Sequence, residues 1–231
     1  MQILAAFVHV FTALGAVCAL FATDAIFSND AQRLFIWLAI ALFIDGIDGT
    51  FARAVDVKTR LPRFSGERLD LVIDYVTYVF VPVLALLHWK YLDGFIGSVL
   101  AGGILLSSLF HFSDEDSKTK DNCFVGFPAI WNIVAFFVFA LDPPQWLTLP
   151  VIASLIIATF VPMPWVHPLR VVALRPVTLA VTAAATVAAI AVLTSGFPAS
   201  LFWQCVLVAV ALYYVALAIV WWRKSEPDPS A

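Results

Sequence analysis

The sequence has little charge for its length. Only 13% of its 231 residues are charged, whereas 62% are hydrophobic. A soluble domain carries about 25% charged residues. The apolar residues also lack amphipathic spacing and form long blocks, and a block of roughly 20 such residues is what a helix needs to cross a bilayer. The composition therefore excludes an ordinary soluble domain and predicts an integral membrane protein.

Cysteine is also scarce. The chain has three cysteines, Cys18, Cys123 and Cys205, which are widely separated and show neither metal-ligand spacing nor a disulfide pattern. We interpret them as small apolar residues in or beside helices. The sequence also lacks the internal repeat that marks many transporters.

The apolar blocks predict an all-α fold, a polytopic transmembrane helical bundle with about eight spans. No Lys or Arg precedes Arg33, so the first block lacks the charged n-region of a secretory signal, and we expect it to be a span. We expect one transmembrane domain over 1–222 and a polar tail over 223–231. The predicted spans cover about 3–23, 34–52, 70–90, 95–112, 123–141, 146–162, 171–194 and 200–222.

The basic residues give the chain an orientation. Of the 13 Lys and Arg residues, only Arg33 and Lys90 fall on one side of an eight-span arrangement. The others gather in loops between spans two and three, between spans four and five, beside the start of span seven and after span eight. Since basic residues favour cytoplasmic loops, the pattern predicts that both termini are cytoplasmic.

Two pairs of acidic residues interrupt the second and third spans. Asp45 and Asp48 are spaced i, i+3, and Asp70 and Asp74 are spaced i, i+4, so each pair shares one face of a helix. The first pair lies in the cytoplasmic half of span two, and the second begins span three. Because consecutive spans run antiparallel, we expect the two pairs to face each other at one depth.

Four carboxylates at a bilayer edge need compensation, since one ionised residue at the membrane centre costs roughly 2.5–3.5 kcal/mol. Hard oxygen ligands suit Mg²⁺ or Mn²⁺, and a pair of such ions can clamp a diphosphate. The residues thus predict a site for Mn²⁺ or Mg²⁺, with two ions. The alternative is a proton or cation pathway in a transporter. The clustering of these acids at one end, with no second acidic cluster in the later spans, disfavours that alternative.

The acids belong to a longer pattern. It reads Asp45-x-x-Asp48-Gly49-x-x-Ala52-Arg53, followed by Gly66-x-x-x-Asp70-x-x-x-Asp74. This pattern resembles the signature of the CDP-alcohol phosphotransferases, whose fold would be a six-helix core, here with two extra helices in one catalytic domain. The resemblance implies metal ligands at Asp45, Asp48 and Asp70, and a general base at Asp74 that also touches a metal. It further implies a diphosphate contact at Arg53 and a floor for the cytidine at Gly49, Ala52 and Gly66.

Three features resemble one bacterial branch of that family, the phosphatidylcholine synthases. The 12 residues from Ala54 to Ser65 make a longer gap than the family's common spacing. The segments Tyr75–Pro82 and Phe124–Asn132 also resemble this branch. The resemblance implies transfer of a phosphatidyl group from CDP-diacylglycerol to choline, with Mn²⁺ or Mg²⁺, giving phosphatidylcholine and CMP.

The choline site is the least defined part. A quaternary ammonium favours aromatic faces, and the candidates near the acids are Tyr75, Tyr78, Trp131 and Asn132. Serine, inositol or glycerol phosphate as the acceptor, or CDP-choline as the donor, stays an alternative, because Arg60, Arg63, Arg68 and Arg170 could serve a phosphorylated acceptor. We expect a multi-pass protein of the bacterial inner membrane with a cytoplasmic active site, lipid as a partner and no nucleic acid. A homodimer is compatible with the sequence.

Overall fold

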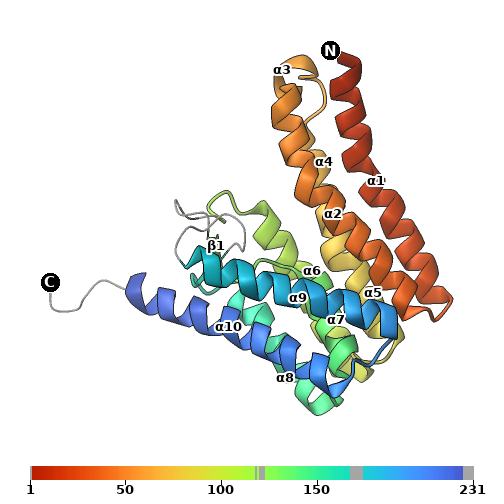
Figure 1. Cartoon of the computed structure of the whole chain (residues 1–231), viewed down its shortest axis with the longest axis vertical. Coiled ribbons are helices and arrows are strands. Elements are labelled where there is room, and N and C mark those ends of the chain that lie inside the picture. Colours follow the sequence, from red (N-terminus) through yellow and green to blue (C-terminus); the bar gives the residue numbers. More distant parts are fainter. Residues whose placement is uncertain (1, 118, 120–122, 167–173, 226–231) are drawn as a thin grey trace, which may run out of the picture. The chain divides into compact units, whose positions relative to one another are not determined.

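The computed structural model describes residues 2–117, 119, 123–166 and 174–225, and these residues are mostly helical (Figure 1). The predicted all-α class is confirmed, since the only strands among them have two residues each. The elements are α1 (Gln2–Phe27), α2 (Ala31–Val55), α3 (Val57–Arg60), α4 (Gly66–Asp74), the π-helix η1 (Tyr75–Phe80), α5 (Val81–His88), α6 (Gly94–Ser113), β1 (Phe124–Val125), α7 (Trp131–Leu141), α8 (Gln145–Ala158), β2 (Pro164–Trp165), α9 (Arg175–Ser195) and α10 (Leu201–Ser225).

Within the described residues, six helical segments are long and apolar enough to cross a membrane, so the chain is a multi-pass membrane protein. One of them is the continuous run of α4, η1 and α5. These segments match six of the eight predicted spans. The other two predicted spans correspond to α7, with 11 residues, and α8, with 14. At 1.5 Å per residue these helices are only about 16 and 21 Å long, less than the roughly 30 Å of a bilayer core.

The fifth predicted span begins later than the sequence suggested, at the start of α7 instead of residue 123. Gly126 has φ 75° and Ala129 has φ 54°, and a Cβ at Gly126 would lie 2.2 Å from the carbonyl oxygen of Thr159. The preceding residues instead form β1, which pairs with β2 in antiparallel register, Phe124 opposite Trp165. The left-handed backbone and the strand pair prevent the apolar block from being helical before Trp131, where α7 begins.

The chain divides into two compact units, which we describe separately. The first comprises Met1–Lys90 and Trp131–Phe136, and the second comprises Tyr91–Ile130 and Phe137–Ala231. All candidate site residues belong to the first unit, and the single domain over 1–222 stays a prediction. The two basic residues between predicted spans four and five, Lys118 and Lys120, lie outside the described part, as do Arg170 and tail residues 226–231. The start of the predicted tail, up to Ser225, is the end of α10.

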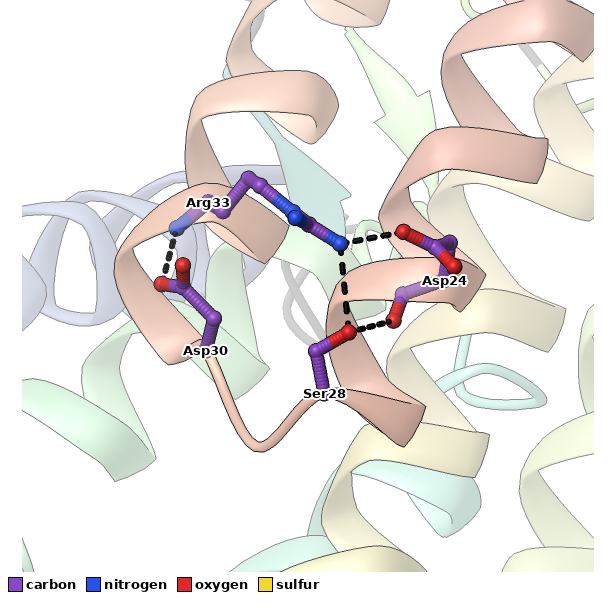
Figure 2. Close-up of polar contacts among 4 residues, drawn as sticks. All are labelled: Asp24, Ser28, Asp30 and Arg33. Atoms are coloured by element: carbon purple, nitrogen blue, oxygen red, sulfur yellow. Dashed lines mark hydrogen bonds and ion pairs between the residues drawn. The ribbon is translucent and has the colours of Figure 1, made fainter.

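Helices α1 and α2 form an antiparallel hairpin whose turn is held by polar contacts (Figures 1 and 2). The Asp30 carboxylate accepts a hydrogen bond from the Arg33 backbone N–H (2.9 Å), which caps the N-terminus of α2. The Arg33 guanidinium forms an ion pair with Asp24 of α1 and a hydrogen bond with Ser28 Oγ (3.3 Å). Arg33 is one of the two basic residues predicted to face away from the cytoplasm.

Small residues let the hairpin and the third span pack closely. The buried face of α1 carries Ala5, Gly15, Ala19 and Ala22 at helical spacing. At Gly15, the third span comes so close that a Cβ would lie 2.5 Å from Cγ2 of Ile73 in α4. These close approaches bring polar residues of α1 and α2 beside those of α4.

The third span changes its winding just after the acidic pair. Ser65 caps α4 by accepting a hydrogen bond from the Arg68 N–H (3.3 Å). The six residues of η1 then form a π-helix, in which the N–H of Val81 donates to the carbonyl of Val76, five residues back. Pro82 follows at once, and a proline ring inside a continuous helix clashes with the carbonyl four residues earlier. A wider turn before Pro82 is a natural accommodation, and π segments are frequent at functional sites.

Candidate metal and nucleotide site

Three of the predicted carboxylates meet between α2 and α4. Asp45, Asp70 and Asp74 each offer one oxygen, and these oxygens all lie within 4.8 Å of one another. All three side chains are partly buried. The expectation that the two acidic pairs face each other is therefore met by three of the four residues.

The fourth carboxylate, Asp48, is not part of that set. It is only 6% exposed, and the hydroxyl of Thr12 on α1 donates to its Oδ2 at 2.7 Å. Thr12 is itself buried, so this hydrogen bond is shielded from the outside of the protein. All four carboxylates nevertheless line one pocket, together with Thr12, Gly15, Ala41, Ile44, Ile73 and Thr77.

A second hydroxyl reaches the acids from the π-helix. The Tyr78 phenol donates to Asp45 Oδ2 at 2.5 Å, and the Tyr78 side chain is buried. Tyr78 was predicted from the sequence as a choline contact. Its ring lies beside the acids as expected, but its polar end is directed at a predicted metal ligand.

The acidic cluster fits a divalent cation. Oxygens bound to one octahedral Mg²⁺ are about 2.9 Å apart when adjacent and about 4.2 Å apart when opposite, so three carboxylate oxygens within 4.8 Å of one another could share one ion after side-chain rotation. Carboxylates are also the ligands that Mg²⁺ and Mn²⁺ prefer. The three aspartates are thus a group that could hold a metal ion.

Two of the predicted nucleotide contacts lie on an open part of α2. The only atom outside the helix backbone near a Cβ built on Gly49 is Nη1 of Arg53, at 3.4 Å. The Arg53 side chain is exposed and folds back along the helix, where its Nη2 donates to Thr50 Oγ1 at 3.2 Å. Packing alone therefore gives no reason for a glycine at position 49.

The other two predicted nucleotide contacts also have packing roles. Ala52 packs against a small apolar cluster formed by Ala5, Val8 and Val57. A Cβ on Gly66 would lie 3.2 Å from Cε1 of His9, whose ring also makes an edge contact with Phe64 at 6.5 Å between centroids. The size limit at Gly66 thus comes at least partly from His9.

The remaining choline candidates differ in access. Tyr75 is partly buried and belongs to η1. Trp131 is fully buried, and Asn132 is 5% exposed with its side-chain oxygen accepting from the N–H of Ile133 at 2.9 Å. In this conformation Trp131 and Asn132 present no open surface, and all these choline contacts stay predictions.

Sequence reasoning missed the contribution of α1. His9, Thr12 and Gly15 are spaced i, i+3 and i+6 on α1. Thr12 and Gly15 line the pocket of the acids, and His9 lies against Gly66. This spacing places them on one helix face. The polar side chains of His9 and Thr12, at that spacing in a mainly apolar span, could have indicated that this face of α1 meets the site.

Comparisons with known proteins identify relatives of this chain. No family model matches the chain. It is 45% identical over 179 residues to phosphatidylcholine synthase of Mesorhizobium japonicum, and the alignment covers 76% of this chain and 65% of that protein. It is 44% identical to the Pseudomonas aeruginosa protein of the same name (76% and 74% covered) and 39% identical to that of Brucella melitensis (94% and 71%).

The alignment with the Mesorhizobium protein spans slightly less than two thirds of that relative's length. The alignments with the Pseudomonas and Brucella proteins cover more than two thirds of each. Their common name agrees with the branch that the loop length and the segments after Asp74 and Cys123 resembled. The chain belongs to the family of bacterial phosphatidylcholine synthases.

Proposed function

We propose that the chain transfers the phosphatidyl group of CDP-diacylglycerol to choline, forming phosphatidylcholine and CMP. The observation that carries this proposal is the meeting of Asp45, Asp70 and Asp74 from two neighbouring spans, in a chain related to phosphatidylcholine synthases. The acids would hold Mn²⁺ or Mg²⁺, with two ions if Asp48 also serves as a ligand. A bound ion of this kind supplies positive charge against the diphosphate.

The residues have distinct parts in this reaction. Asp74 takes the proton of the choline hydroxyl while the choline oxygen bonds to the phosphorus that carries the diacylglycerol. The bond from that phosphorus to the CMP oxygen breaks, and its electron pair leaves with CMP. Arg53 contacts the diphosphate, and the bare surface at Gly49 lets the nucleotide approach α2. Transfer is direct, with no covalent enzyme intermediate.

The choline ammonium would lie against aromatic faces of η1. Tyr75 is partly buried next to Asp74, and Tyr78 is already beside Asp45. A cation over such a ring gains about 0.5–2 kcal/mol. Trp131 and Asn132 could join this site only if α7 moved, because both are buried.

The site would face the cytoplasm in a bacterial inner membrane. The basic loops support this orientation through their distribution. The pairing of β1 with β2 adds support, since it joins the segment before α7 to the segment after α8. Both segments then lie on one side of the membrane. The chain therefore returns to the same side after α7 and α8, and the orientation predicted for α9 and α10 is the same as with two full spans. No observation on the described residues supports the homodimer that the sequence allowed.

The test is an assay of the purified chain in detergent with CDP-diacylglycerol, labelled choline and Mn²⁺. Parallel reactions contain labelled serine, inositol or glycerol phosphate in place of choline. We expect label in lipid only with choline, equimolar release of CMP, and loss of both after chelation of the metal. Incorporation of serine but not choline would overturn the acceptor, and no incorporation with any acceptor would overturn the activity.

A further inference from the structure

We propose that the hydroxyls of Thr12 and Tyr78 orient Asp48 and Asp45 for metal binding. Both donors lie outside the acidic pattern, on α1 and η1. This inference rests on the proposed metal site, and it assigns these two side chains as positioning residues.

The two contacts have the same form. Asp45 and Asp48 lie about one turn apart on α2, and in each of them Oδ2 accepts a hydroxyl hydrogen bond, at 2.5 Å from Tyr78 and 2.7 Å from Thr12. Hydrogen bonds to a carboxylate are shorter and about twice as strong as neutral ones. Each contact therefore restricts rotation of the carboxylate and fixes the direction of its other oxygen.

A hydroxyl is well suited to this task. An Arg or Lys at the same place would also orient the carboxylate, but its positive charge would compete with a metal ion. Thr12 and Tyr78 are neutral donors, so the carboxylates keep their full charge for a cation. In known metal sites, the groups that hydrogen-bond the ligands typically contribute 10–100-fold to metal affinity.

The local structure explains why these two residues reach the acids. Gly15, one turn after Thr12, permits the close approach of α1 to α4, so the short Thr12 side chain can reach Asp48. Tyr78 belongs to the π-helix that starts directly after Asp74. The wider winding turns Tyr78 relative to its place in an α-helix, and in this arrangement its phenol meets Asp45 on α2.

Conservative variants separate orientation from packing. Thr12→Val removes the hydroxyl at nearly constant volume, and Thr12→Ser keeps it. Tyr78→Phe removes only the phenol oxygen. Matched controls are Thr23→Val, whose hydroxyl donates only to the Ala19 carbonyl of its own helix at 2.8 Å, and Tyr91→Phe, whose phenol bonds Asp142 in the second unit.

The measurement is direct Mn²⁺ binding to the purified protein without substrate, by the electron paramagnetic resonance signal of free Mn²⁺. We expect Thr12→Val and Tyr78→Phe each to weaken binding about 10-fold or more, whereas Thr12→Ser and both controls bind as wild type. Wild-type affinity in Thr12→Val and Tyr78→Phe would overturn the proposal. Equal loss in Thr12→Val and Thr12→Ser would also overturn it for Thr12.

Choline and CDP-diacylglycerol are absent from this measurement, so its result does not depend on the acceptor. If Mn²⁺ binding falls as expected but the chain transfers phosphatidyl to no acceptor, only the proposed function fails. Thermal unfolding of each variant in detergent checks the fold. A variant that binds Mn²⁺ weakly but unfolds at the wild-type temperature has lost the orientation of the site. If Thr12→Val unfolds at a lower temperature, Mn²⁺ binding is compared between Thr12→Ser and the wild type instead.

Discussion

A methyl group on Gly15 would lie 2.5 Å from Cγ2 of Ile73, the residue immediately before Asp74. Cγ2 is attached directly to Cβ, and isoleucine in a helix strongly prefers one χ1 rotamer, so Ile73 cannot move aside easily. The contact therefore sets the distance between α1 and α4 at the level of the acidic cluster.

We expect Gly15→Ala to destabilise the protein by about 1–3 kcal/mol through overpacking and to lower turnover, because α4 carries Asp70 and Asp74. Thermal unfolding in detergent and the transfer assay measure the two effects. In the double variant with Ile73→Ala, the loss of stability should be smaller than the sum of the single losses. Gly102→Ala is the control, since a Cβ there meets nothing within 4 Å. Wild-type stability in Gly15→Ala would contradict the interpretation.

At Gly49 the structure predicts that a methyl group does not lower stability and weakens only substrate binding. An added methyl would meet only the flexible Arg53 side chain at 3.4 Å, so Gly49→Ala should unfold at or above the wild-type temperature. If the nucleotide lies against this surface, KM for CDP-diacylglycerol should rise about 10-fold or more. Unchanged kcat/KM would remove Gly49 from the nucleotide site, and Gly102→Ala again serves as the control.

Gly66 combines both kinds of constraint. A methyl group there would press on His9 at 3.2 Å, so Gly66→Ala should lower both stability and activity. Adding His9→Ala should restore most of the stability by removing the clash. If Gly66 also forms part of the surface against which the nucleotide lies, turnover of the double variant stays low. Full recovery of turnover would instead mean that Gly66 matters only through His9.

The acidic cluster could be predicted because helical spacing fixes which side chains share a face. Because consecutive spans run antiparallel, the two acidic pairs are expected at the same depth, where they can face each other. Asp45, Asp70 and Asp74 do come together. The contributions of Thr12 and Tyr78 could not be predicted in this way. They depend on the separation of two helices and on a π-helical turn, and neither follows from the period of an apolar pattern.

The short helices show a second limit. An apolar block over 123–141 has the composition of a span, but Gly126 and Ala129 adopt left-handed backbone there and α7 starts only afterwards. At Gly126 and Phe127 the backbone N–H groups donate to the carbonyls of Met163 and Ala158, more than 30 positions along the chain, instead of to a helical partner. The Thr159 carbonyl lies 2.2 Å from where a Cβ on residue 126 would be, so only glycine fits there. Contacts of that kind are set by the folded structure and leave little trace in local composition.

Asp74→Asn tests the proposed general base. An amide keeps the size of the side chain and one oxygen that can ligate a cation, but it cannot accept the choline proton at neutral pH. We expect kcat to fall at least 100-fold, with CDP-diacylglycerol binding and thermal stability close to wild type. Asp24→Asn is the matched control, because Asp24 pairs with Arg33 outside the cluster and should retain turnover. Normal kcat in Asp74→Asn would remove Asp74 from that role.

The last prediction concerns stability at high pH. Tyr91 lies between two spans, and its phenol donates to Asp142 at 2.8 Å. Burial, followed by the hydrogen bond and the negative charge of Asp142, raises the pKa of Tyr91 above its usual value of about 10. The folded state thus holds the phenol proton more tightly than the unfolded chain does. The stabilisation is complete below pH 10 and is lost as the pH rises through the folded pKa.

Unfolding temperatures between pH 8 and 11 should therefore fall more steeply above pH 10 in the wild type than in Tyr91→Phe. At pH 8 the Phe variant should be the less stable of the two, since it lacks the hydrogen bond. Asp142→Asn should fall between them, because the amide oxygen still accepts the bond and asparagine tolerates the φ of 45° at this position. Parallel pH profiles for the wild type and Tyr91→Phe would show that this phenol does not control the alkaline transition.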